Sequence, residues 1–236
     1  MTKFSELVEH RRSSRVPFDT SRAIPTGDLQ QVLNAARWAP TAHNMQNFEL
    51  IAIDDPQLLK AIGELPSGFS EVFARENYEH LAFSEDELRR KKVGILAAQF
   101  PPFMRQPPFK PDPNDPALKE NRFGQLIAAT SVLLIVLYNP TTRAPASEGD
   151  FLGHVSLGCV MQNMWLAAAD VGIGFHVVSS LAAPPMEGQL RKLLGFPEPH
   201  KIAFTVRLGY PVMPANQVRV RRDVEGFVHR NKWGAK

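Results

Sequence analysis

Apolar residues recur with a helical period in some segments of this chain and run almost continuously in others. Residues 27–38 predict an amphipathic helix, because their apolar side chains fall three, four and seven positions apart, at Leu29, Val32, Leu33 and Ala36. Thr26 is the expected N-cap of this helix, and Pro40 ends it. A long, mostly buried helix is expected over residues 153–171, and another helix is expected to end near Gly195.

Strands are expected where apolar and β-branched residues form short runs, at residues 48–53, 131–138, 173–178 and 202–208. The second run is apolar at nearly every position, which is typical of a central strand buried on both faces. Together with the helices, these runs predict an α+β fold, or an α/β-like sandwich, in which helices flank a central sheet.

Residues 66–116 differ in character from the rest of the chain. Ser84 and Glu87 have the spacing of a capping box ahead of an expected helix over residues 88–100. Seven prolines follow within residues 101–116, so no helix can continue there. The segment is either a surface insertion packed on the body or a lid over a pocket. A chain of this length with 44% hydrophobic residues can form one large core or two small ones. We expect a single domain, residues 1–236, that includes this excursion.

Positive charge is concentrated near the end of the chain. The formal net charge is +3, but residues 207–236 contain seven Lys and Arg against two acids. Aromatic residues are not interleaved with these basic residues as nucleic-acid stacking requires, and no zinc-finger spacing occurs. A local anion site therefore explains the charge better than nucleic-acid binding, and an ordinary solvated surface is the alternative.

The chain lacks the residues that several other classes of protein require. Cys159 is the single cysteine, so no internal disulfide can form, and its apolar helical setting is typical of a structural thiol. The seven histidines have no paired metal-ligand spacing, and no metal is expected. The longest apolar run, residues 126–138, is shorter than the roughly 20 residues of a membrane span, and no signal peptide is evident. We expect a cytoplasmic protein without a membrane role.

Two short segments near the start carry the most information. Arg11-Arg12-Ser13-Ser14-Arg15 places three guanidinium groups and two hydroxyls within five residues, a set of donors suited to an anionic ligand. The second segment is Ala39-Pro40-Thr41-Ala42-His43-Asn44-Met45-Gln46-Asn47. In order and spacing, the pair resembles the FMN-dependent nitroreductase family, whose motifs typically read R-R-S-x-R and A-P-S-x-x-N-x-Q-P-W. The likeness continues to Ile173-Gly174 and Arg219-Val220-Arg221, and is weakest over residues 66–116.

The resemblance implies a homodimer with a central mixed, mainly antiparallel sheet and an FMN at the subunit interface. In the first segment, Arg11 and Ser13 would contact the phosphate or the ribityl chain, with Arg12 in the same cofactor-binding stretch. Arg15 would approach flavin N1 and O2 and stabilise the reduced anion, because its charge is permanent.

The second segment would serve the flavin of the partner subunit. By the family motif, the contacting positions are Pro40, Thr41, Ala42 and Asn44, with Thr41 in place of the usual serine. Gln46 would hold the loop through its amide. Asn47-Phe48 replaces the common Pro-Trp.

The resemblance also implies cofactor contacts at three further pairs of positions. Arg219 and Arg221 match a phosphate-binding pair, within an ending that has Asp223 where proline is usual. Arg122 and Gln125 fall near an Asn/Lys pair that touches the flavin pyrimidine edge. Backbone N–H groups at Val178 and Ser179 would face N5, although the glutamate that many members carry there is absent.

The implied function is an FMN-dependent oxidoreductase that uses NAD(P)H to reduce a small electron acceptor, such as a nitroaromatic or a quinone, by a ping-pong mechanism. The cofactor would carry the chemistry and the protein would orient it. Alternatives remain within the same fold, namely flavin cleavage, dehalogenation or ring oxidation, because a shared fold does not decide among them. A noncatalytic flavin-binding protein and a basic nucleic-acid binder are alternatives from other classes.

Overall fold

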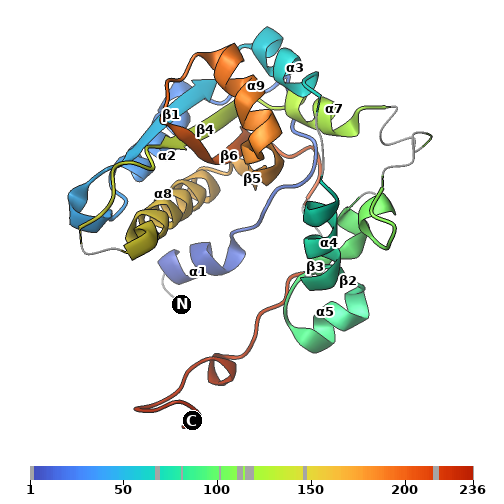
Figure 1. Cartoon of the computed structure of the whole chain (residues 1–236), viewed down its shortest axis with the longest axis vertical. Coiled ribbons are helices and arrows are strands. Elements are labelled where there is room, and N and C mark those ends of the chain that lie inside the picture. Colours follow the sequence, from blue (N-terminus) through green and yellow to red (C-terminus); the bar gives the residue numbers. More distant parts are fainter. Residues whose placement is uncertain are drawn as a thin grey trace. The chain divides into compact units, whose positions relative to one another are not determined.

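The structure of the protein is a computed structural model that describes residues 3–66, 70–80, 82–100, 102–110, 114, 120–145, 148–214 and 218–235. The chain divides into two compact units, both drawn in Figure 1. The first unit comprises residues 1–68 and 122–215, and the second comprises residues 69–121 and 216–236. The single domain expected over residues 1–236 stays a prediction.

The first unit contains a four-stranded antiparallel sheet in the order β1-β4-β6-β5. Its strands are β1 (Phe48–Ile53), β4 (Val132–Tyr138), β5 (Gly174–Val177) and β6 (Lys201–Gly209). Strand β4 lies inside the sheet and is buried at all but its last residue, as its apolar run predicts. Ser13 forms a parallel bridge with Phe175 at the free edge of β5, so the pairing is mixed but mainly antiparallel.

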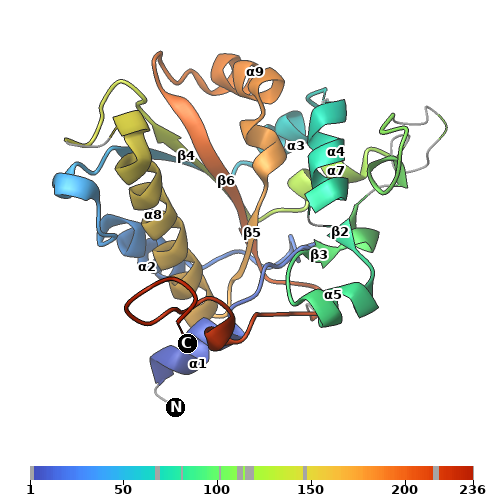
Figure 2. The same ribbon diagram turned by 60° about the horizontal axis from the view of Figure 1, so that its bottom comes forward.

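Helices cover both faces of this sheet (Figures 1 and 2). On one face, α2 (Thr26–Arg37) and α8 (Phe151–Asp170) pack on the sheet, and α1 (Lys3–His10) packs against α8. The core beneath them contains fully buried side chains from the two inner strands: Leu134, Val136, Val206 and Leu208. Burying an aliphatic side chain completely contributes about 1.5–3 kcal/mol, so this layer supplies much of the stability of the unit.

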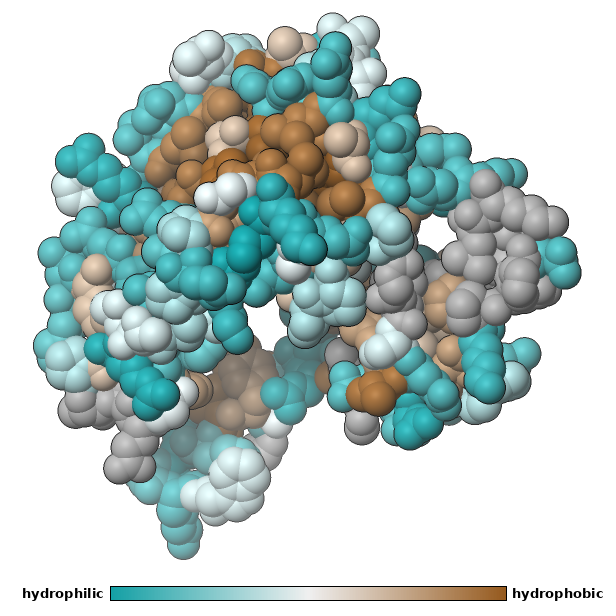
Figure 3. All heavy atoms as spheres, turned by 45° about the horizontal axis from the view of Figure 1, so that its top comes forward, coloured by the Kyte–Doolittle hydropathy of each residue, from teal (hydrophilic) through white to brown (hydrophobic). Residues whose placement is uncertain are grey.

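On the opposite face lie α3 (Pro56–Gly63), α7 (Arg122–Ala128) and α9 (Pro184–Leu194), with η5 (Ser179–Ala182) after β5. Their core includes Ile135 and Leu181, which are fully buried. Gly63 lets α3 approach α7 closely, because a Cβ at this position would lie 2.5 Å from the carbonyl oxygen of Gly124. Hydrophobic residues also gather at the surface on the side of α3 and α9, within a hydrophilic border (Figure 3).

The second unit contains the expected excursion. Its elements are α4 (Glu71–His80), α5 (Glu85–Lys91), a two-stranded parallel sheet of β2 (Ala82–Phe83) and β3 (Ile95–Leu96), and the short helices η2 (Ala97–Gln99), η3 (Pro102–Met104) and η6 (Val224–Gly226). Its small core consists of Ala74, Phe103, Met104 and Phe109. Lys92 Nζ donates to Asp223 Oδ2 over 2.5 Å, which ties the C-terminal segment to the residue after α5.

Most expected elements are confirmed, and two expectations are wrong. The helix over residues 27–38 is found as α2, but Pro25 occupies its N-cap position and Thr26 is its first residue. The capping box of Ser84 and Glu87 is confirmed, but its helix does not reach residue 100. Lys92 has a left-handed backbone with φ of 55°, which ends α5, and the chain then continues into β3.

Candidate functional site

The arginine-rich segment, residues 11–15, lies along the edge of β5. Ser14 N donates to Phe175 O over 2.9 Å, next to the bridge between Ser13 and Phe175. Trp165 of α8 donates through Nε1 to Arg12 O over 3.1 Å. Hydrogen bonds to the backbone of this segment therefore fix it against both the sheet and the Trp165 side chain of α8.

Two aromatic rings support the first arginine of the segment. The Arg11 guanidinium carbon lies 4.1 Å from the centroid of the Trp165 ring, a cation–π distance. The Trp165 ring in turn stacks on Phe175, with 4.9 Å between the ring centroids. This arrangement orders Arg11 at the edge of the sheet.

Arg15 has a different environment. Its guanidinium makes no hydrogen bond or ion pair with any residue that the structure describes. Burial nevertheless lowers the pKa of Arg15, although an arginine remains charged at neutral pH. A partly desolvated cation with free donors favours an anionic ligand.

Arg207 is the principal site residue that the sequence reasoning missed. Its side chain is fully buried. Arg207 Nε donates to Thr130 Oγ1 over 2.8 Å, and Nη2 donates to Ala129 O over 3.2 Å. The third partner is His176, whose Nδ1 lies 3.1 Å from Arg207 Nη1. Within the described ranges, no carboxylate pairs with this charge, and burial lowers the pKa of Arg207 to about 9.

Phe18 completes the surroundings of Arg207. The guanidinium carbon of Arg207 lies 4.5 Å from the centroid of the Phe18 ring. Gly209 makes room for this ring, because a Cβ at that position would lie 2.6 Å from Phe18 side-chain atoms. The Phe18 ring is therefore held against the guanidinium by close backbone packing.

His176 stands opposite Arg207 in the register of β5 and β6. Burial lowers the pKa of His176 to about 3, and the positive charges of Arg207 and Arg15 act in the same direction. The imidazole is therefore neutral at physiological pH. Two cations, Arg15 and Arg207, therefore act electrostatically on a neutral imidazole at the edge of the sheet.

The second motif forms a strained loop that contains η1 (Ala42–Asn44). His43, Asn44 and Gln46 have left-handed backbones with φ of 51°, 53° and 46°. Such conformations cost energy in residues other than glycine, and they cluster at functional segments. Gln46 holds the loop as expected, since its backbone N donates to Thr41 Oγ1 over 3.1 Å and its Nε2 donates to Asn44 Oδ1 over 3.1 Å.

Helix α8 anchors this loop. Ala42 N donates to Ser156 Oγ over 2.9 Å. Trp165, which holds the arginine-rich segment, lies nine residues further along α8, about 14 Å along the helix axis. The two motifs are thus attached to one helix at separate points.

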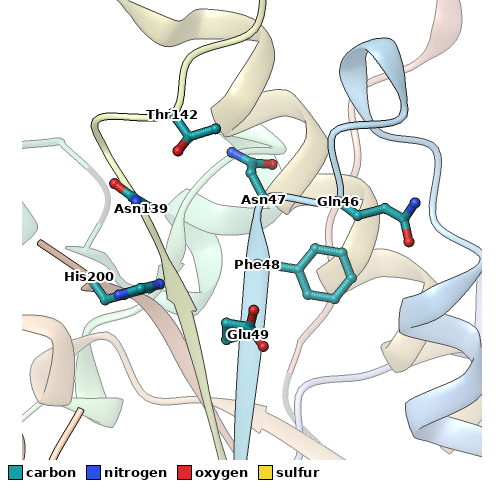
Figure 4. Close-up of a pocket in the computed structure, with 7 residues that line it drawn as sticks. All are labelled: Gln46, Asn47, Phe48, Glu49, Asn139, Thr142 and His200. Atoms are coloured by element: carbon teal, nitrogen blue, oxygen red, sulfur yellow. The ribbon is translucent and has the colours of Figure 1, made fainter. Parts of the chain in front are cut away.

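A polar pocket of about 180 Å³ lies where the loop meets β1 (Figure 4). Side chains from three places in the first unit line it: Gln46, Asn47, Phe48, Glu49, Asn139, Thr142 and His200. Asn47 Nδ2 and His200 Nδ1 are buried there without a hydrogen-bond partner. The replacement of Pro-Trp by Asn47-Phe48 therefore gives this pocket an unmatched donor. The pocket contains none of the residues expected to contact flavin.

The remaining candidate residues lie in both units. Arg122 and Gln125 are exposed, one helical turn apart on α7. The backbone N–H of Val178, the residue after β5, already donates to Thr205 O of β6 over 2.9 Å. The contact expected from Ser179 stays a prediction.

Arg219 and Arg221 belong to the second unit and are exposed. Arg221 Nη1 donates to Val220 O over 2.7 Å. Asp223, which replaces the usual proline, pairs with Lys92, and this bond lowers the pKa of the Asp223 carboxyl. The phosphate role of the two arginines stays a prediction.

Among the residues that the structure describes, no group of three or more His, Cys, Asp and Glu gathers as metal ligands would. None of the helices in that part of the chain has the length and apolar character to cross a bilayer.

Comparison with known proteins identifies the family. The profile of the Nitroreductase family matches residues 8–210, and the chain belongs to that family. A protein of Archaeoglobus fulgidus with the provisional name NADH dehydrogenase/NAD(P)H nitroreductase is 24% identical over 234 residues, which cover 99% of this chain and 100% of the relative. The NADPH-flavin oxidoreductase of Vibrio harveyi is 32% identical over 95 residues, 40% of this chain and 38% of the relative.

Solved structures show the same fold. A Desulfitobacterium hafniense nitroreductase with bound FMN superimposes with a TM-score of 0.60 at 18% identity, covering 98% of this chain and 100% of that one. The expected fold class and the resemblance to nitroreductases are thus confirmed. The expected class of enzyme, an oxidoreductase, is confirmed by the family and by the named relatives.

Proposed function

We propose that this protein is an FMN-dependent oxidoreductase that is reduced by NADH or NADPH and reduces a small acceptor such as a nitroaromatic or a quinone. The observation that carries the proposal is a pair of arginines that both act electrostatically on His176, the unpaired Arg15 and the buried Arg207, with no carboxylate paired to either in the described part of the chain. The names of the relatives support the same chemistry, since they include an NADPH-flavin oxidoreductase and a nitroreductase with bound FMN.

The donor set fits this cofactor. FMN has a dianionic phosphate and a pyrimidine edge that becomes negative on reduction, and both favour arginine. Arg15 would stabilise the pyrimidine edge, an electrostatic effect often worth about 3 kcal/mol in enzyme sites. When bound, the flavin supplies the hydride-accepting ring, and the protein orients both substrates. In the first unit, Arg11 and Ser13 would hold the phosphate or the ribityl chain. Arg219 and Arg221 are proposed separately as phosphate-binding residues.

The proposed functional unit is a homodimer with the flavin at its interface. Helix α8 carries exposed apolar residues in its first turns, where Phe151 is 69% exposed and Val155 is 46% exposed. These residues precede Ser156 on α8, and Ser156 anchors the loop at residues 40–47. A second subunit on this apolar surface would receive that loop, so that Pro40, Thr41, Ala42 and Asn44 could reach its flavin. The cytoplasmic location is part of the same proposal.

The purified protein is expected to be yellow, to release FMN on denaturation, and to bleach on addition of NADH or NADPH without oxygen. The reason is the cationic donor set together with the family motifs. Absorbance spectra and identification of the released flavin test this result. Oxidation of NAD(P)H in the presence of a nitroaromatic or a quinone then separates an enzyme from a noncatalytic flavin-binding protein. A colourless protein that takes up no FMN on titration would refute the proposal.

Arg221→Ala is expected to weaken FMN binding about 10- to 150-fold, because a charged hydrogen bond to phosphate is worth about 1.5–3 kcal/mol. Fluorescence titration measures the affinity. Riboflavin, which lacks the phosphate, should bind the variant and the parent equally well. Arg230→Ala removes the same charge from another exposed position in the second unit and serves as the control. Equal FMN affinities of Arg221→Ala and the parent would exclude the phosphate role.

A further inference from the structure

Arg207 connects three elements that carry the candidate flavin contacts of the first unit. Through Ala129 and Thr130 it binds the two residues that follow α7, the helix of Arg122 and Gln125. Through His176 it binds β5, the strand that leads to Ser179. Its guanidinium also lies over Phe18, three residues after Arg15.

The contact between Arg207 and His176 determines where the imidazole carries its proton. A guanidinium has only donors, so the hydrogen bond from Nη1 requires an unprotonated Nδ1. A neutral His176 must then carry its proton on Nε2. Within the described part of the chain, His176 Nε2 has no hydrogen-bond partner. The fully buried polar atoms that lack a partner do not include Nε2, so this atom is not fully buried. The Nε2–H donor is therefore accessible to a ligand.

A structural role alone explains this arrangement poorly. A buried cation without a counter-ion carries a large desolvation cost, which an apolar side chain in β6 would avoid. Hydrogen bonds to Thr130, Ala129 and His176 satisfy donors of Arg207 but leave its charge uncompensated. An anion bound nearby would supply the missing compensation.

We propose that Arg207 is a positioning residue that holds His176 as an Nε2–H donor and that, together with Arg15, stabilises the negative charge of the reduced flavin. The inference rests on the proposed function, since it takes the flavin as the anion. Arg207 acts through its hydrogen bond to His176 and through the electrostatic field of its own charge. His176 Nε2 is the atom that contacts the ligand. The three groups bind the reduced cofactor more tightly than the oxidised one and so raise its reduction potential.

The first test uses the FMN-free full chain. Nuclear magnetic resonance of ¹⁵N-labelled histidine distinguishes the two neutral tautomers at neutral pH, and His176→Gln identifies the signal of His176. The parent is expected to show the Nε2–H tautomer alone. Arg207→Met, which removes the donor to Nδ1, is expected to show both tautomers. A parent with the proton on Nδ1, or with a doubly protonated ring, would overturn the proposal.

The second test measures the affinities of the oxidised and the reduced flavin, from titration and from the midpoint potential. Arg207→Met is expected to lower the ratio of reduced to oxidised affinity about tenfold, which corresponds to about 30 mV for a two-electron couple. Arg37→Met is the matched control, because it removes the same charge from an exposed position on α2. The flavin midpoint potential of Arg37→Met should equal that of the parent.

His176→Phe gives a second route if Arg207→Met does not fold. It should lower the same affinity ratio by removing the donor, and His176→Gln, which keeps an N–H donor, should restore part of the loss. Unchanged ratios in both Arg207→Met and His176→Phe, in proteins that bind FMN, would overturn this proposal and leave the proposed function intact. A parent that binds no FMN would instead refute the proposed function and, with it, the flavin as the anion.

Discussion

Heterodimers of an Arg15→Ala chain with an Asn44→Ala chain are expected to recover activity that neither mutant homodimer has. The proposed homodimer places residues 11–15 of one subunit and residues 40–44 of the other at the same flavin. Each heterodimer then contains one site with both lesions and one site with none. Random pairing of equal amounts makes about half of the dimers mixed, so about a quarter of all sites should be intact.

Differently tagged chains allow purification of the mixed dimers before activity is measured. The matched control pairs Arg15→Ala with Arg11→Ala. These lesions lie in the same segment, so each site of the heterodimer keeps one of them and no site is restored. A monomer with full activity in analytical ultracentrifugation would contradict the arrangement. Verified heterodimers of two impaired variants that regain no activity would contradict it equally.

The second large effect is a loss of stability in acid through His176. Its folded pKa of about 3 lies below the ordinary value of 6.5. Between these values the unfolded chain binds a proton that the folded chain does not bind. The free energy of unfolding therefore falls as the pH drops from about 6.5 towards 3, by up to about 1.4 kcal/mol for each pH unit. The cause is burial together with the charges of Arg207 on β6 and of Arg15 on the segment beside β5.

Urea unfolding at a series of pH values measures this effect, with His176→Phe compared against the parent. The variant should lose stability less steeply below pH 6.5, and the two slopes should agree at higher pH. Asp19, Glu87 and Asp223 also have lowered pKa values, but they titrate in both proteins and cancel in the comparison. Parallel curves over the whole acid range would show that His176 is not buried in neutral form.

Local sequence patterns determined most of the secondary structure and the family. The run at residues 131–138 contains almost no polar side chain and many β-branched ones, which predicts a central strand, and β4 is that strand. Ser84 and Glu87 cap α5 because both partners lie within one helical turn. The motifs at residues 11–15 and 39–47 carry their information in consecutive side chains, which is why the family resemblance could be read without the fold.

Features that depend on distant residues were decided only by the tertiary structure. Arg207 lies in an apolar strand, and nothing near it in sequence indicates that its partner is His176, 31 residues away; the register of β5 and β6 creates the pair. Likewise, Asp223 gained a partner in Lys92 across 131 residues. The end of α5 depended on the left-handed backbone of Lys92, which composition does not reveal. Periodicity and capping are local, whereas burial of a charge and its hydrogen-bond partners arise only when separate strands come together.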